Sequence, residues 1–130
     1  MYQELLQKAK EISKNAYCPY SKFQVGACIL YESGKKYEGC NVENASYGLS
    51  LCAERNAMSS AVANGEKTKI KAIAIYSPNQ KKCLPCGACR QWIAEFAIND
   101  KETKIILEDD NSTPLVLNLE DIFPYGFKFE

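Results

Sequence analysis

The sequence predicts an α/β fold in which helices cover a single β-sheet. Segments with apolar residues at helical spacing alternate along the chain with short apolar runs that are typical of strands. Turn residues separate these segments, and a chain of 130 residues needs only one core. We therefore expect one domain over residues 1–130, with its elements in the order α-β-β-α-β-α-β-β.

The first half of the chain predicts a helix, a hairpin and a second helix. Apolar residues recur every three or four positions over residues 3–16, which indicates an amphipathic helix. Alternating apolar residues over 23–29, a turn at 32–35 and a returning segment over 36–42 indicate two antiparallel strands. Good helix formers over 52–63, closed by an Asn-Gly pair, indicate a helix that begins at Cys52.

The second half predicts a central strand, a third helix and two more strands. Residues 70–76 are mostly apolar on both faces, as in a strand that is covered on both sides. The helix expected over 86–98 also begins at a cysteine, and its predicted buried stripe is Ala88, Trp92, Ile93, Phe96 and Ala97. Residues 104–108 and 115–119 indicate strands, and 120–123 a short turn. Strand-helix-strand crossovers should place their strands parallel and bring both cysteine-bearing helix starts to one edge of the sheet.

Composition argues against several classes of protein. Sixteen basic and sixteen acidic residues cancel, and no basic run exceeds two residues, so no nucleic-acid partner is expected. No apolar stretch approaches the roughly 20 residues that span a membrane, and the charged N-terminal segment is unlike a signal peptide. Seven cysteines fit reduced thiols better than a disulfide framework. We expect a cytoplasmic protein with a small-molecule ligand and no membrane partner.

Three cysteines and one glutamate form the pattern of a catalytic zinc site. Catalytic zinc is typically held by three protein ligands, with water in the fourth position. The pair Cys86 and Cys89, together with the remote Cys52, supplies three thiolates in a chain without histidine. The positive ends of two helices would favour the thiolate forms. We expect one Zn²⁺ per chain on these three cysteines, with Glu54 as the catalytic proton carrier.

Two alternatives remain open at this motif. On a regular helix Glu54 would project about 200° away from Cys52, so catalysis requires an irregular first turn; otherwise Glu54 only interacts with the helix dipole. Cys83 lies at zinc spacing from Cys86, so a closed structural site of four cysteines is the competing interpretation. The remaining cysteines, interpreted as small core residues, are Cys18, Cys28 and Cys40.

Three thiolates around a divalent ion leave a net negative charge, which a neighbouring donor should offset. Arg55 and Arg90 each lie next to a predicted ligand, and Arg55 is the stronger candidate for a side chain that faces sulfur. The alternative is that both arginines lie on helix surfaces and pair with Glu66 or Glu95.

Four segments of the chain resemble those of one enzyme family. They are Tyr20–Ala27, Gly39–Tyr47, Cys52–Arg55 and Pro85–Gln91, in the family's order and across nearly the whole length. On these segments the chain resembles the small homotetrameric class of cytidine deaminases, whose zinc signature includes a glutamate that is not a ligand. The resemblance implies a three-layer α/β/α fold with a five-stranded mixed sheet.

The resemblance also implies the reaction. Hydroxide generated at zinc would attack carbon 4 of cytosine, while Glu54 moves a proton to ring nitrogen 3 and then to departing ammonia. Cytidine and deoxycytidine would become uridine and deoxyuridine, which is a step of pyrimidine salvage.

The resemblance further implies how the nucleoside is held. Asn41 and Glu43, two residues apart on one face of an extended segment, would hold the ribose hydroxyls. Phe23 would pack against the pyrimidine, and the backbone N–H of Ala53 would bind the carbonyl oxygen of the base. Without the resemblance, Asn41 and Glu43 fit a solvated turn, and Phe23 fits a position in the core. The residues that would close the pocket of a neighbouring subunit in a homotetramer are Ala45, Tyr47 and Phe127.

Two other functions remain as alternatives. Deaminases of other cytosine compounds, such as blasticidin S, share the metal segment, although residues 41–44 resemble the ribose-binding one. A zinc-stabilised binding module without catalysis would need a closed site of four thiolates. A deaminase of nucleic acids is disfavoured by the zero net charge.

Overall fold

The computed structural model describes residues 1–129, and within them one five-stranded mixed sheet carries helices on both faces. The strands are β1 (Gly26–Tyr31), β2 (Lys36–Cys40), β3 (Ile70–Tyr76), β4 (Lys104–Glu108) and β5 (Pro114–Asn118). They lie in the order β2-β1-β3-β4-β5; β3 and β4 are parallel, and the other neighbours are antiparallel. The predicted α/β fold and its element order are confirmed.

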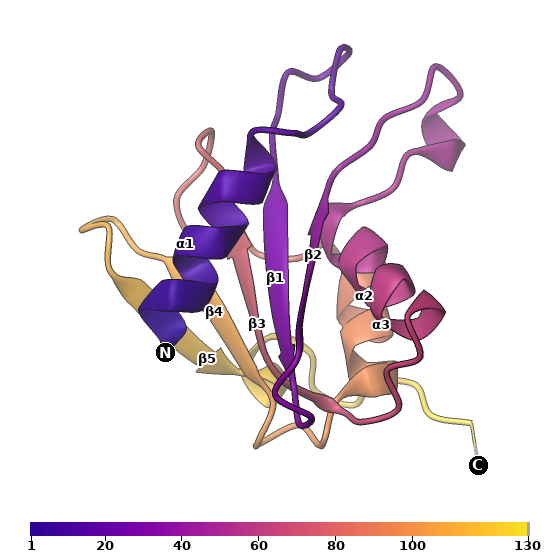
Figure 1. Ribbon diagram of the computed structural model, residues 1–130, viewed down its shortest axis with the longest axis vertical. Helices are drawn as coiled ribbons and strands as arrows, with labels where there is room; N and C mark the ends of the chain where they lie inside the picture. The colour runs from indigo at the N-terminus through magenta and orange to yellow at the C-terminus, as the bar shows by residue number, and fades with distance from the viewer. Residues whose placement is uncertain (130) are drawn as a thin grey trace.

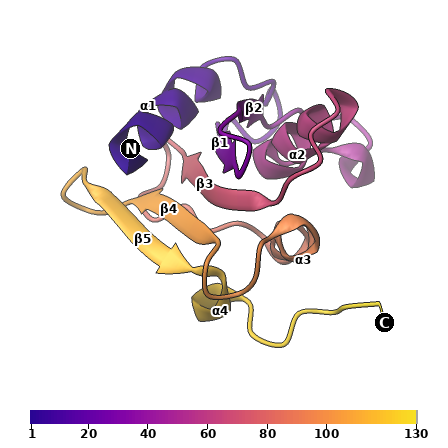
Figure 2. The ribbon, with the colours of Figure 1, turned by 60° about the horizontal axis from the view of Figure 1, so that its bottom comes forward.

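The helices form the two outer layers of the molecule. They are α1 (Tyr2–Ser13), α2 (Ala53–Ala63), α3 (Gly87–Phe96) and the short α4 (Leu119–Ile122), with a 3-10 turn, η1, at Tyr47–Leu49. α1 covers one face of the sheet, and α2, α3 and α4 lie on the other (Figure 1, Figure 2). No helix within residues 1–129 combines the length and the apolar character needed to cross a membrane.

Each face of the sheet has its own apolar cluster. Leu5, Leu6 and Ala9, which share one stripe of α1, pack with alternate residues of β1 such as Cys28 and Leu30. On the other face, residues of α2 and α3 pack with the intervening β1 residues, such as Ile29. β1 is therefore buried along its whole length on both sides, rather than on one side only.

The strand boundaries differ from the prediction where side chains replace the hydrogen bonds of a ladder. β1 begins at Gly26 rather than at Phe23, because the N–H groups of residues 23–25 donate to side chains and not to a neighbouring strand. β2 ends at Cys40 rather than at Val42, which makes only isolated bridges to other loops. The segments before β1 and after β2 therefore belong to two long loops at one end of the sheet (Figure 1).

Helix boundaries also differ from the prediction. α1 ends at Ser13, three residues before its predicted end, and α3 ends at Phe96 instead of residue 98. At the C-terminal end, Asn118 and Asp121 form a capping box, so residues 119–122 make a helix where a turn at 120–123 was expected.

The predicted buried stripe of α3 is partly wrong. Ile93 and Ala97 are buried, but Ala88 and Trp92 are exposed. Cys89 is the buried residue of the first turn, because α3 is rotated so that its cysteine edge faces α2. Trp92 instead lies on the outer surface against Phe96, and the two ring centroids are 6.3 Å apart.

Glycine 39 determines how closely α2 approaches the sheet. A Cβ atom on Gly39 would lie 2.5 Å from the carbonyl oxygen of Ala53 and from the backbone nitrogen of Ala57, a distance that real Cβ atoms essentially never show. α2 can therefore lie this close to β2 only because residue 39 has no side chain. This contact fixes the first turn of α2, which carries Glu54.

We expect Gly39→Ala to lower the free energy of unfolding by about 1–3 kcal/mol, because the added methyl group must push α2 away from β2. Urea denaturation measures this loss. Gly48→Ala is the matched control, since a Cβ atom there meets no other atom within 4 Å. The control should change the free energy of unfolding by less than about 0.5 kcal/mol, and equal losses in both variants would contradict the close-contact account.

Candidate metal centre

Three cysteine side chains converge where the N-termini of α2 and α3 meet. The Sγ atoms of Cys52, Cys86 and Cys89 all lie within 4.8 Å of one another, and those of Cys52 and Cys86 are 3.8 Å apart. Two sulfurs that are each about 2.3 Å from one zinc ion at a tetrahedral angle lie about 3.8 Å apart. The three side chains therefore fit zinc, and no fourth His, Cys, Asp or Glu joins the group in the part of the chain that the structure describes.

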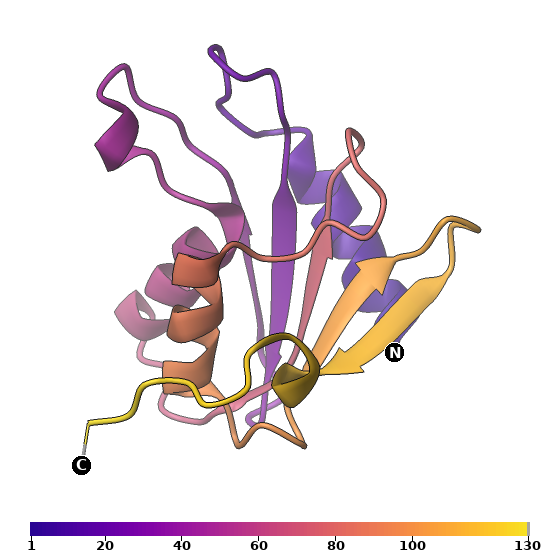
Figure 3. The ribbon, with the colours of Figure 1, turned by 180° about the vertical axis from the view of Figure 1, so that it is seen from behind.

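α2 and α3 each have a cysteine as the N-cap. Cys52 precedes α2 with φ −75° and ψ 155°, and Cys86 precedes α3 with φ −67° and ψ 168°. The backbone N–H of Cys89 donates to the Sγ of Cys86 over 3.5 Å. Figure 3 shows the two helices side by side, with both starts at the same end of the sheet. Their positive ends therefore face the sulfur atoms and stabilise the thiolate forms.

Arg55 adds a positive charge at the cysteines. Its Nη2 donates to the Sγ of Cys52 over 3.3 Å. Hydrogen bonds from the Cys89 thiol and from Arg55 lower the pKa of Cys52. The same hydrogen bond, together with burial, raises the pKa of Cys89. Both donors therefore favour the thiolate form of Cys52.

Arg90 donates its hydrogen bonds to backbone carbonyl groups. Its Nε donates to the carbonyl oxygen of Pro85 and its Nη1 to that of Ile122, each over 2.7 Å. Arg90 therefore ties the loop before Cys86 to α4. Neither the sulfur-facing interpretation nor a surface ion pair with an acidic side chain describes this residue.

Glu54 is buried beside the cysteines. It lies in the first turn of α2 and is 4% exposed. Because Cys52 is an extended N-cap and not a helical residue, both side chains line the same cavity instead of pointing about 200° apart. Burial raises the pKa of Glu54 to about 7. A carboxyl group with a pKa near neutrality can both accept and release a proton.

A cavity of about 380 Å³ opens beside Glu54 and the cysteines. Four residues indicated for substrate binding line it: Phe23, Asn41, Glu43 and Ala53. Reasoning from the sequence did not assign the other lining residues, which are Ser21, Val25, Ser50, Leu51 and Leu84. Ser21 and Val25 lie in Tyr20–Ala27, one of the four segments that resemble the enzyme family. Ser50, Leu51 and Leu84 lie outside those segments.

Asn41 and Glu43 also hold the loops around the cavity. The Oδ1 of Asn41 accepts from the N–H of Val25 over 2.9 Å, and its Nδ2 donates to the carbonyl oxygen of Phe23 over 2.7 Å. The carboxylate of Glu43 accepts from two backbone N–H groups at residues 20 and 21 and from the Ser21 hydroxyl. The hydroxyl bond lowers the pKa of Glu43. An amide and a carboxylate have further hydrogen-bonding capacity beyond these contacts.

Cys83 does not belong to the group of three thiols. It is buried in the core on the α2 face and lines the cavity, and burial raises its pKa to about 11. Its sulfur is not one of the three that lie within 4.8 Å of one another, so the closed site of four cysteines is not supported. Of the other cysteines, Cys28 is fully buried, and Cys18 and Cys40 are half-buried.

Ala45, Tyr47 and Phe127 lie on the outside of the chain. Tyr47 is 79% exposed and Phe127 is 71% exposed, and none of the three lines the cavity beside the cysteines within residues 1–129. Tyr47 lies edge-on to Tyr20, and the two ring centroids are 6.4 Å apart. The backbone of Phe127 exchanges two hydrogen bonds with the side chain of Gln91 on α3.

Comparisons with known proteins agree on one family. A family model described as the cytidine and deoxycytidylate deaminase zinc-binding region matches residues 1–103. The cytidine deaminase of Halalkalibacterium halodurans is 39% identical over 128 residues, which cover 98% of this chain and 95% of that protein. Among crystal structures, the cytidine deaminase from Burkholderia pseudomallei gives a TM-score of 0.88 at 39% identity, covering 98% of this chain and 99% of that one. The enzyme from Mycobacterium tuberculosis gives 0.83 at 35% identity and covers 98% of each chain.

Zinc content distinguishes the three-cysteine site from the four-cysteine site. We expect about one zinc ion per wild-type chain, and Cys52→Ser should lose it because only two thiolates remain. Cys83→Ser makes the same substitution at a thiol outside the group and should keep the metal. Elemental analysis after dialysis measures both. Loss of zinc from Cys83→Ser with retention in Cys52→Ser would favour the closed structural site.

Proposed function

Because the chain belongs to the cytidine and deoxycytidylate deaminase family, we propose that it catalyses the zinc-dependent hydrolysis of cytidine and deoxycytidine to uridine and deoxyuridine with release of ammonia. The position of Glu54 supports this proposal most directly. This residue is buried beside three converging thiols, at a cavity whose volume suits a small ligand.

Cys52, Cys86 and Cys89 are the residues that would hold the metal. When bound, zinc supplies a Lewis acid that makes a water molecule acidic enough to act as a nucleophile near neutral pH. Three thiolates on a divalent ion leave a net negative charge. Arg55 and the two helix N-termini offset that charge from the protein side.

Glu54 moves the protons of the reaction. Its carboxylate takes a proton from the attacking water and delivers it to ring nitrogen 3 of the base. Glu54 then moves the remaining proton of the added water from the hydroxyl on carbon 4 to the amine, so the C–N bond breaks and ammonia leaves. The water oxygen remains on carbon 4 as the carbonyl oxygen of the product. Burial of Glu54 keeps this path away from bulk solvent.

Residues of the surrounding loops hold the nucleoside. Phe23 packs against the pyrimidine, and the backbone N–H of Ala53, at the start of α2, binds the carbonyl oxygen of the base. Asn41 and Glu43 bind the ribose hydroxyls with the hydrogen-bonding capacity that their contacts to the loops leave over. A free base lacks these hydroxyls, so the same two residues select nucleosides.

The exposed loop and tail residues point to an assembly. In the proposed homotetramer, Ala45, Tyr47 and Phe127 of a neighbouring subunit close the cavity. The exposure of the two aromatic rings supports this proposal, because large apolar groups at a surface often mark an interface. A single domain, a cytoplasmic location and a role in pyrimidine salvage belong to the same proposal.

Glu54→Gln tests the proton carrier. The amide cannot accept a proton, so we expect kcat for cytidine to fall by about 10²- to 10⁴-fold or more while zinc content stays the same. Loss of the cytidine absorbance band measures the rate. The matched control is Glu38→Gln, the same substitution at an exposed site on β2, which should leave kcat unchanged. A wild-type protein inactive on both cytidine and deoxycytidine would refute the proposed function.

Light scattering of the purified protein tests the assembly. We expect a particle of about four chains, as in a closed symmetric oligomer. A particle that remains a monomer at the concentrations used for assays, yet is fully active, would contradict the shared-cavity proposal.

A further inference from the structure

The segment that carries Phe23 is held by side chains and not by a neighbouring strand. Each backbone N–H of residues 23–25 donates to a side chain, and the acceptors are, in order, Ser21 Oγ at 3.0 Å, Asn79 Oδ1 at 2.9 Å and Asn41 Oδ1 at 2.9 Å. Of these acceptors, Asn79 is the most distant in the sequence. It lies 55 residues from Gln24, in the loop between β3 and α3.

The loop that carries Asn79 leads directly to the metal centre. It leaves the end of β3 after Tyr76 and reaches Cys86, the N-cap of α3. On the way, Cys83 and Leu84 line the cavity. The hydrogen bond from Gln24 to Asn79 therefore joins two segments of the cavity wall, of which one carries Phe23 and the other precedes the metal-binding cysteines.

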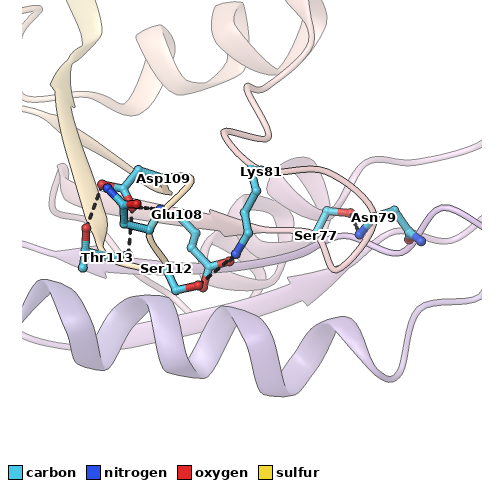
Figure 4. Close-up of polar contacts among 8 residues, drawn as sticks. Ser77, Asn79, Lys81, Glu108, Asp109, Ser112 and Thr113 are labelled. Carbon is cyan, nitrogen blue, oxygen red and sulfur yellow. Dashed lines mark hydrogen bonds and ion pairs between the residues drawn. The ribbon is translucent and has the colours of Figure 1, made fainter.

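The same loop is anchored on its other side by the turn between β4 and β5. Lys81 Nζ bonds to the Glu108 carboxylate and to Ser112 Oγ (3.1 Å), as Figure 4 shows, and the backbone N–H of Lys82 donates to the carbonyl oxygen of Glu108 over 2.8 Å. Asp109 closes that turn through hydrogen bonds from Thr113. The loop is thus attached to a turn that has its own internal hydrogen bonds.

Asn79 itself is fixed before it meets Gln24. Its backbone N–H donates to the hydroxyl of Ser77 over 3.1 Å, and Ser77 is 4% exposed at the end of β3 (Figure 4). The side-chain oxygen of Asn79 is therefore presented by a loop anchored at two points, Ser77 and Lys81.

Backbone strain lies on both sides of this contact. Lys22 (φ 61°) and Lys82 (φ 50°) adopt the left-handed conformation, and each immediately precedes a cavity residue, Phe23 or Cys83. Residues with side chains keep this conformation only where their surroundings hold them in it. The hydrogen bond between Gln24 and Asn79 connects the two strained segments.

We propose that Asn79 is a positioning residue for the deamination reaction, which acts by holding the backbone at Gln24 so that the Phe23 ring stays against the pyrimidine. This inference rests on the proposed function. Asn79 does not line the cavity within the described residues, so its effect reaches the substrate through Phe23.

Asn79→Ala removes the acceptor and tests the inference in kinetics. We expect KM for cytidine to rise about three- to tenfold, with kcat and zinc content unchanged. Loss of the hydrogen bond from Gln24 to Asn79 should weaken binding of the substrate and of the transition state equally. Asn79→Asp keeps an oxygen acceptor at the same position and should restore KM to within about twofold of wild type. Gln80→Ala, at the exposed neighbouring residue, is the control that should leave KM unchanged.

A double-mutant cycle tests whether the effect passes through Phe23. In a Phe23→Leu background, the further change Asn79→Ala should leave KM nearly unchanged, because the ring that it positions is absent. Additive effects, or an Asn79→Ala variant whose kcat and zinc content fall together with its affinity, would overturn the positioning role.

Hydrogen exchange at the backbone N–H of Gln24 tests the hydrogen bond to Asn79 without any turnover. Exchange should become faster in Asn79→Ala and stay slow in Asn79→Asp and Gln80→Ala. Unchanged exchange and unchanged KM in Asn79→Ala would refute the inference. Because this readout needs no substrate, a failed contact is distinguishable from a failed proposed function, which would show instead as a wild-type protein that does not deaminate cytidine.

Discussion

The metal centre, and much of the fold around it, depends on the meeting of the N-termini of α2 and α3. Cys52 and Cys86 are the N-caps of α2 and α3, so the residues that begin the helices are also the ones that present sulfur. Three thiolates in a small space repel one another, and the two helix ends and Arg55 provide the compensating positive charge. Other features of the fold follow from this meeting. Gly39 lets α2 lie against β2, and α3 is oriented with Cys89 buried and Trp92 facing outward.

The same N-cap geometry gives Glu54 its position. Because Cys52 is extended, Glu54 in the first helical turn lines the same cavity as the sulfur atoms and is nearly inaccessible to solvent. The loops around it have little regular structure and are held by side chains instead. Asn41 and Glu43 serve both as supports of these loops and as the proposed ribose ligands. The cost of an irregular wall is that its shape depends on single contacts such as the one between Gln24 and Asn79.

Reasoning from the sequence could predict the element order, because apolar periodicity is a local property of the chain. It could also predict that the three cysteines lie together with Glu54 beside them, because their chemistry and spacing are specific. It failed at residues 23–25, whose alternation resembles a strand, because the acceptors of their N–H groups are up to 55 residues away. Arg90 and Trp92 could not be placed for a similar reason: the carbonyl groups that Arg90 binds and the rotation of α3 are set by tertiary packing. Strand order likewise depends on pairings that no local pattern encodes.

An open site of three thiolates has one position left for water, and a closed structural site has none. X-ray absorption at the zinc edge of the loaded protein distinguishes the two most directly, because it counts the atoms bound to the metal. An open site should give three sulfur atoms at about 2.3 Å and one oxygen at about 2.0 Å. Four sulfur atoms with no oxygen would instead show a closed structural site and refute the open one.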